Sequence, residues 1–150
     1  MKKKIFITLL LAACTFSLTG CKKDKEQYEL YKNEVEILYN SVVTANATIN
    51  NINVYDEESV DTLLKEISEI ETSLRVFSEV DAPEKYDQCE VLSLKAADCF
   101  KDAKEAFDKA FNGETFDEIS YNNGIVNINN GVENINYMGL VLQGTTIEFE

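Results

Sequence analysis

The sequence predicts an all-α fold, an up-down-up-down antiparallel four-helix bundle with long helices that follows a cleaved signal peptide. Beyond residue 24, apolar residues recur at alternating steps of three and four over four separate stretches. A helix gathers this spacing on one face, and a strand cannot reproduce it. The connections between the stretches are short, which favours neighbouring helices of opposite direction. We expect helices at approximately 24–53, 57–80, 83–112 and 115–143.

The first two helices are predicted from the two most regular apolar runs. The first run consists of Tyr28, Tyr31, Val35, Leu38, Val42, Ala45, Ile49 and Ile52. Asparagine is a poor helix former, so we expect Asn50, Asn51 and Asn53 to end this helix. Asp56 then stands where an N-cap residue belongs. The second run consists of Val60, Leu63, Ile67, Ile70, Leu74 and Phe77.

The third helix is predicted between a proline and a glycine. Pro83 stands where the first turn of a helix tolerates proline, and Gly113 is expected to stop the helix in the left-handed conformation. The apolar run between them consists of Cys89, Leu92, Ala96, Cys99, Ala103, Ala106 and Ala110. Its alanines predict a close approach to another helix, for which Gly124 and Gly131 offer a small opposing surface. An exposed groove for a partner helix is the functional alternative.

The fourth helix contains a seven-residue near-repeat, in which 122–128 and 129–135 both follow the pattern Asn-Asn-Gly-[Ile/Val]-x-Asn-Ile. Each glycine costs a helix about 1 kcal/mol relative to alanine. The heptad spacing nevertheless keeps each residue type on its own stripe, so we expect a helix that Gly144 ends. The alternative is a loop with a short strand, paired with a second strand at 145–149.

The charge of the chain excludes some classes of partner. Without the first twenty residues, the chain has 11 basic and 27 acidic residues, which gives a net charge of −16. Nucleic acid binding needs clustered Lys and Arg, so no nucleic acid partner is expected. The same acidity argues against the protein body lying flat on anionic lipid.

The first twenty residues have the composition of an export signal. Lys2, Lys3 and Lys4 form a short positive segment, and an apolar stretch from residue 5 to about 18 follows. The segment ends at Leu18-Thr19-Gly20-Cys21, which resembles the lipobox of bacterial lipoproteins. The resemblance implies that the Cys21 thiol carries diacylglycerol, that Leu18, Thr19 and Gly20 are recognised by signal peptidase II, and that residues 1–20 are removed.

Two alternatives to this interpretation are less consistent with the sequence. A retained membrane-spanning helix would need roughly 20 apolar residues, and this stretch has about 15. Leu11-Ala12-Ala13-Cys14 fits the same box, but cleavage before Cys14 would leave too short an apolar core.

The two remaining cysteines are predicted to be free and buried, so no disulfide is expected. Cys89 and Cys99 lie ten residues apart on one helix, about 15 Å by helical rise, beyond the reach of a disulfide. They could bridge only if the helix broke between them or if two chains paired. Copper(I) storage by two thiols without histidine is disfavoured, and no metal site is predicted.

Catalytic chemistry has little support in the sequence, and we predict that the protein is not an enzyme. The chain has no histidine, the commonest general base near neutral pH. Acid-rich stretches lack the spacing of a calcium loop, and a helix fans their carboxylates apart. Paired carboxylates could serve a glycosidase, but a narrow bundle offers little cleft.

Around 60 residues of the second half loosely resemble the small helical lipoproteins of low-GC Gram-positive bacteria. The resemblance rests on Ala82-Pro83-Glu84-Lys85-Tyr86, a heptad run and Asn112-Gly113-Glu114. It implies surroundings and not an activity: a location on the extracytoplasmic face of the cell membrane, between membrane and wall. Apart from the diacylglycerol on Cys21, no cofactor is expected.

These observations together predict a non-enzymatic binding module of the cell envelope. Its partner would be an envelope protein, a peptide or a wall polymer, contacted through Asn122, Asn129 and Asn136 on the fourth helix, because amides both donate and accept hydrogen bonds. The alternative is an immunity or exclusion lipoprotein that intercepts a toxin, a cationic peptide or a phage protein. A carrier of a small ligand or metal is a third hypothesis, which requires a cavity between helices.

Overall fold

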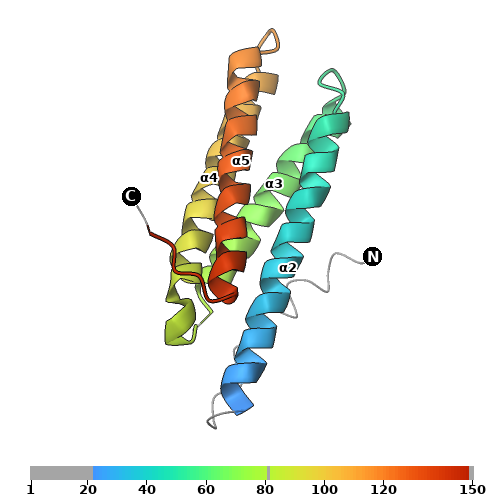
Figure 1. Ribbon diagram of the computed structural model, residues 1–150. Helices are drawn as coiled ribbons and strands as arrows, with labels where there is room; N and C mark the ends of the chain where they lie inside the picture. The colour runs from blue at the N-terminus through green and yellow to red at the C-terminus, as the bar shows by residue number, and fades with distance from the viewer. Residues whose placement is uncertain (1–21, 81, 149–150) are drawn as a thin grey trace.

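The computed structural model describes residues 22–80 and 82–148. All secondary structure in these ranges is helical (Figure 1). The four helices pack against one another. They are α2 (Lys22–Asn51), α3 (Glu57–Ser78), α4 (Asp87–Phe111) and α5 (Glu118–Leu142), with a short 3-10 turn, η1 (Glu84–Tyr86), before α4. The all-α prediction is confirmed, and the strand alternative for the fourth segment is wrong where it falls on 122–142. Leu18, Thr19, Gly20, Cys21 and Cys14 lie outside the described residues.

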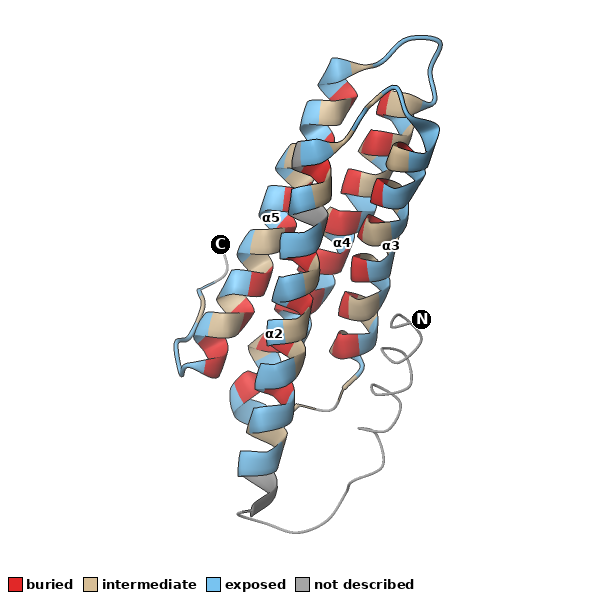
Figure 2. Cartoon of the chain, turned by 90° about the vertical axis from the view of Figure 1, so that its right-hand side faces the viewer, coloured by how far each residue is buried: buried red, intermediate tan, exposed pale blue. Residues whose placement is uncertain are grey.

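The helices do not contact one another equally. α4 packs closely along both α3 and α5, whereas α2 touches α3 and α5 much more sparsely. In Figure 1 the connections from α2 to α3 and from α4 to α5 lie at one end of the molecule, and the connection from α3 to α4 lies at the other. Figure 2 shows the buried residues on the inward sides of the helices. The core is therefore built mainly by α3, α4 and α5, and α2 covers one side of it.

Two helices begin later than the sequence predicts. The third begins at Asp87 rather than 83, because Pro83 has extended backbone (φ −59°, ψ 140°) and its carbonyl accepts from the Tyr86 amide in a tight turn. The fourth begins at Glu118 rather than 115, because the Asp117 carboxylate accepts from the amides of Ile119 and Ser120 and fixes the start there.

The other helix ends differ by one or two residues from the prediction. The first helix ends at Asn51, within two residues of the asparagine-rich stop that was predicted. The second helix ends at Ser78, two residues before the predicted end. Asp56 does occupy the cap position of α3, but its side chain makes no capping hydrogen bond. Its carbonyl accepts from the Val60 amide instead.

The two glycines predicted to end helices behave differently. Gly144 has a φ of +92°, so it ends α5 in the left-handed region as expected. Gly113 does not adopt a positive φ, and that expectation is wrong. At this end of α4 the Asp117 amide folds back to the Ala110 carbonyl at 3.0 Å, which satisfies a terminal carbonyl without a left-handed residue.

The glycines of the near-repeat explain how α5 packs on α4. A Cβ at Gly124 would come within 2.8 Å of the Phe107 ring, and one at Gly131 within 2.7 Å of the Phe100 ring. Both rings are fully buried. The small surface of α5 therefore receives phenylalanine rings, not the alanine stripe that we expected to oppose it. The two glycines are seven residues apart, and so are the two phenylalanines that they meet. The seven-residue repeat therefore serves the packing of α5 on α4.

Candidate functional site

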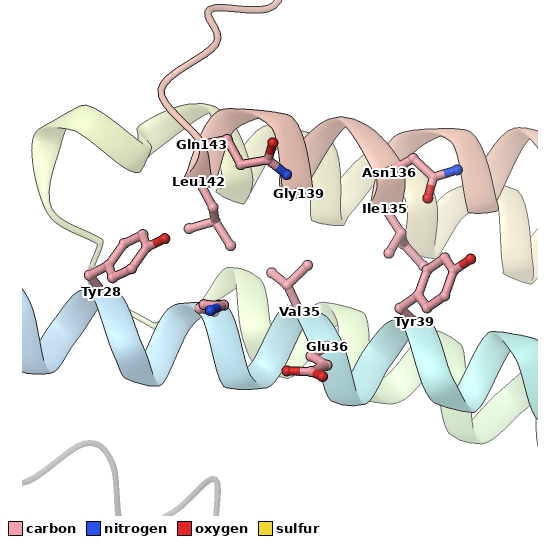
Figure 3. Close-up of a pocket in the computed structure, with 10 residues that line it drawn as sticks. Tyr28, Val35, Glu36, Tyr39, Ile135, Asn136, Gly139, Leu142 and Gln143 are labelled. Atoms are coloured by element: carbon pink, nitrogen blue, oxygen red, sulfur yellow. The ribbon is translucent and has the colours of Figure 1, made fainter.

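An open groove between α2 and α5 is a candidate site in the described residues (Figure 3). Its volume is about 440 Å³, within the usual range for ligand pockets. The floor is apolar, because Val35, Ile135 and Leu142 project into the space between the two helices. All three side chains are largely buried, so the floor is continuous with the hydrophobic core.

Two tyrosines of α2 mark the ends of the groove. Tyr28 and Tyr39 are separated by about 16 Å of helical rise. Tyr28 is held by the buried Tyr86, whose ring centroid lies 5.9 Å away. Tyr39 is 45% exposed, so much of its ring is open to solvent. A ring at each end offers flat apolar surface with a polar hydroxyl, a combination enriched at binding interfaces.

The end of the groove near Tyr28 is braced by an aromatic cluster. The Tyr31 ring meets the Phe77 ring edge-on with centroids 4.9 Å apart, and the Tyr31 hydroxyl donates to the Val80 carbonyl at 3.0 Å. This cluster fixes the beginning of α2 against the end of α3, and so fixes the position of Tyr28.

Polar side chains line the rim of the groove. Lys32 and Glu36 lie on α2, and Asn136 and Gln143 lie on α5. Lys32, Glu36, Asn136 and Gln143 are exposed. The rim therefore offers one cation, one anion and two amides above an apolar floor, a set suited to binding and orienting a partner.

Gly139 leaves a notch in the wall that α5 contributes. A Cβ built at Gly139 would meet no atom within 4 Å, in contrast to the crowded Gly124 and Gly131. Gly139 faces the groove (Figure 3), and its missing side chain increases the depth of the groove at this point.

The predicted asparagine face is only partly involved in the groove. Asn136 lines it, whereas Asn122 and Asn129 are exposed further along α5 and do not line it. Sequence reasoning missed the whole contribution of α2, because the helix that faces α5 cannot be read from one sequence. A usable signal was present: Tyr39 and Val43 are apolar but lie outside the main apolar stripe of α2.

The two cysteines of α4 differ in burial. Cys89 is completely buried and its thiol points to the Met138 carbonyl at 3.8 Å, and burial raises its pKa to about 12. Cys99 is only half-buried, so the expectation of burial is wrong for this residue. Burial, and then the charges of Asp102 and Asp98, raise its pKa. Both thiols are free, and both are held in the protonated form, which is unreactive at neutral pH.

The described residues offer little else for chemistry. Within 22–80 and 82–148, no group of three or more Cys, Asp or Glu side chains is arranged to hold a metal ion. No helix in the same ranges is long and apolar enough to cross a membrane.

Comparisons with protein families, with curated proteins and with solved structures find no match to this chain. Its function must therefore be argued from the groove and from the sequence.

Proposed function

We propose that this protein is a lipid-anchored, non-enzymatic binding module of the cell envelope that holds a partner in the groove between α2 and α5. The observation that carries the proposal is the groove itself, with an apolar floor formed by Val35, Ile135 and Leu142 and a polar rim. The partner is an envelope protein, a peptide or a wall polymer, and Tyr39 and Asn136 are exposed side chains of the groove that can meet it.

The arrangement that we infer for the helices is an up-down-up-down antiparallel four-helix bundle. Three features support it: the connections are short, the helices that follow each other in the chain are in contact, and α2 also contacts α5. The pairing of Phe107 with Gly124 and of Phe100 with Gly131 further supports opposite directions for α4 and α5. Spin labels at Leu30 and Leu140, both exposed, would lie close together in this arrangement, and labels at Leu30 and Val126 would lie far apart.

The anchor that we propose is the lipid on Cys21. Leu18, Thr19 and Gly20 supply the recognition sequence, and Lys22, Lys23 and Lys25 would meet the headgroups. Since α2 begins at Lys22, no linker separates the anchor from the helices. The 30-residue α2 would extend about 45 Å from the membrane, on its extracytoplasmic face.

The anchor is tested by metabolic labelling with a fatty acid such as palmitate. We expect the label on the wild-type protein and on Cys14→Ser, and no label on Cys21→Ser. The matched cysteine at position 14 controls for loss of export. A label that survives in Cys21→Ser and disappears in Cys14→Ser would contradict the assignment.

The groove is tested by site-specific photo-crosslinking on intact cells. A photoreactive residue at Tyr39 is expected to capture a partner, and the same residue at Val91 is the control, because Val91 lies on α4 and is equally exposed (44% against 45%). Asn136→Ala should weaken capture from Tyr39, and Asn122→Ala, outside the groove, should leave it unchanged. Equal capture at both positions, or none at Tyr39, would refute the groove as the binding site.

An immunity or exclusion role is a special case of this proposal, in which the partner is a toxin, a cationic peptide or a phage protein. The net charge of −16 in the mature sequence favours it, because an acidic surface steers cationic partners toward it. Deleting the gene should then increase sensitivity to cationic bacteriocins or to phage. Unchanged sensitivity would leave an endogenous envelope partner as the ligand.

A further inference from the structure

We propose that the occupant of the α2–α5 groove is a cationic amphipathic helix of a partner protein, which seats one apolar side chain in the notch at Gly139. This inference rests on the proposed function, because it names the partner of the same groove. Three features of the described residues carry it: the composition of the two rims, the distribution of charge and the open space at Gly139.

The two rims present matching helical stripes. Along α2 the outward stripe follows steps of three and four through Glu29, Lys32, Glu36, Tyr39 and Val43, all of which are exposed. Along α5 an equivalent exposed stripe runs through Asn122, Val126, Asn129, Glu133, Asn136, Leu140 and Gln143, of which Asn136 and Gln143 line the groove. A third helix laid between two helices meets stripes of this kind, since residues three and four apart share a helical face.

The charge of these segments selects a cationic partner. Residues 33–64 contain no Lys or Arg, and neither do residues 110–150. All of α2 beyond Lys32 and the whole of α5 therefore lack a cation. Glu36 stands exposed on the α2 rim, and Glu133 is exposed on α5 three residues before the rim residue Asn136, where it accepts a hydrogen bond from the Tyr137 hydroxyl at 2.6 Å. A partner with Lys or Arg flanking its apolar face would satisfy these carboxylates, and an acidic partner would be repelled.

The notch at Gly139 suits the insertion of a side chain from a helix. In helix packing a side chain of one helix enters a hollow among residues of the other, and a glycine deepens the hollow. Gly139 has no atom within 4 Å of its missing Cβ, and Asn136, Leu142 and Val35 surround the open space. This is the point where a partner helix approaches most closely.

The length of the groove fits a short helix. The distance of about 16 Å between Tyr28 and Tyr39 corresponds to about three helical turns. Apolar residues at i, i+4 and i+11 of the partner, which span about 16 Å, would then contact Tyr39, the Gly139 notch and Tyr28 in turn, and amphipathic helices bind grooves through such a face.

The proposal is tested on the full-length protein in detergent, with a fluorescent synthetic helix of leucine and lysine as the probe. Its leucines stand at i, i+4, i+7 and i+11, so that its apolar face spans the groove, and binding is followed by fluorescence anisotropy. Gly139→Leu fills the notch and is the main variant. Leucine is a better helix former than glycine, and its Cβ would meet no atom within 4 Å here, so urea unfolding should show a stability equal to or above that of the wild type.

Two matched pairs of variants separate specific from general effects. Glu36→Gln with Glu133→Gln (the rim charge variant) removes charge from the outward stripes of α2 and α5, and Glu69→Gln with Glu90→Gln removes the same charge from exposed positions on α3 and α4. Tyr55→Ser with Ile119→Ser removes the two most exposed apolar side chains (88% and 76%), both of which lie outside the groove.

We expect Gly139→Leu to weaken probe binding roughly tenfold, the equivalent of one well-packed side chain. The rim charge variant should weaken binding at low salt and match the wild type at high salt, because exposed ion pairs are screened. The α3/α4 charge variant and the Tyr55/Ile119 variant should bind as the wild type does. A leucine–glutamate helix should not bind.

Several outcomes would overturn the proposal. Wild-type binding by Gly139→Leu would exclude the notch, and equal loss in the two charge variants would mean general attraction to an acidic protein. Loss in the Tyr55/Ile119 variant would move the site away from the groove. If crosslinking from Tyr39 captures a partner on cells but the probe does not bind, this inference fails and the proposed function stands. If Tyr39 captures nothing, the proposed function fails whatever the probe does.

Discussion

Gly124, Gly131 and Gly139 lie on the same helix but meet different surroundings. The first two are covered by phenylalanine rings of α4, and the third borders open space. A glycine within a helix lowers stability relative to alanine, unless a side chain there would collide with a neighbour. Comparing the three positions therefore distinguishes two effects of glycine: its intrinsic destabilisation of a helix, and the room that it leaves for a neighbouring side chain.

Alanine at these positions should change stability in opposite directions. Gly131→Ala and Gly124→Ala should each destabilise the fold by about 1–3 kcal/mol, because Phe100 or Phe107 must move. Gly139→Ala should stabilise it by about 0.4–1 kcal/mol. Urea unfolding monitored by circular dichroism measures all three free energies. A gain in stability at 124 or 131 would contradict the close packing of α4 on α5.

Asp117 gives the start of α5 a pH dependence. Hydrogen bonds from the Ser120 hydroxyl and amide, with one from the Ile119 amide, lower the pKa of its carboxyl. A lowered pKa in the folded state means that the stabilisation is complete above the unfolded pKa of about 3.9 and is lost as the pH falls through the folded pKa.

The test of this dependence compares wild type with Asp117→Asn. Asparagine also caps helices but does not titrate, so the difference in stability between the two proteins should change only below about pH 4. Asp56→Asn is the control, since the Asp56 side chain makes no capping hydrogen bond. An equal pH response in both variants would show that the Asp117 cap does not cause it.

At the scale of elements, α2 should open more readily than the other helices. It touches α3 and α5 sparsely, whereas α4 is packed on two sides. Segments with few buried contacts open locally at low free energy. The slowest amides of α2 should exchange about tenfold faster than those of α4, a difference of about 1.4 kcal/mol in the free energy of opening.

Hydrogen exchange measured by mass spectrometry checks this order. Tyr31→Phe removes the bond from its hydroxyl to the Val80 carbonyl and should increase exchange in α2 further, with little change in α5. Equal protection of α2 and α4 amides from exchange would contradict the prediction, because it would mean that α2 opens no more readily than α4.

The elements show why the helices, but not all of their ends, follow from the sequence. The apolar run of α3 from Val60 to Phe77 was predicted residue by residue, because its periodicity records its buried face. The predicted start of the third helix at Pro83 was wrong, because proline is found both in the first turn of a helix and in extended backbone just before one. The start of α5 depends on Asp117, an N-cap residue type like Asp56, so this start was readable from the sequence but was not predicted.

At the scale of the whole molecule, charge should limit stability. The full chain carries −13, and long segments of it contain no cation. Like charges repel across the folded surface, and added salt screens them. Raising NaCl from 0.02 to 0.3 M should increase Tm by roughly 2–4 °C, equivalent to about 1 kcal/mol.

Differential scanning calorimetry tests this expectation. KCl at the same ionic strength should act equally, because screening depends on ionic strength and not on the cation. A fall in Tm with salt would mean that the ion pairs of the structure, such as Arg75 with Asp98 at 2.8 Å, outweigh the repulsion.

The candidate site was predictable only in part. Asn136 was predicted and lines the groove, but Asn122 and Asn129, which share its heptad position, do not line it. The groove exists because α2 and α5 meet sparsely, and the closeness of two helices distant in sequence is a tertiary property that no single-helix pattern encodes.

The stacking of phenylalanine on glycine also limits how the chain can misfold. A near-repeat of seven residues would let α5 slip by one heptad along α4 and present Gly131 to Phe107. The slip would bring Met138, seven residues beyond Gly131 and fully buried, under Phe100, where a Cβ already collides. This slip is therefore excluded, because the position seven residues beyond Gly131 carries a large side chain in place of glycine.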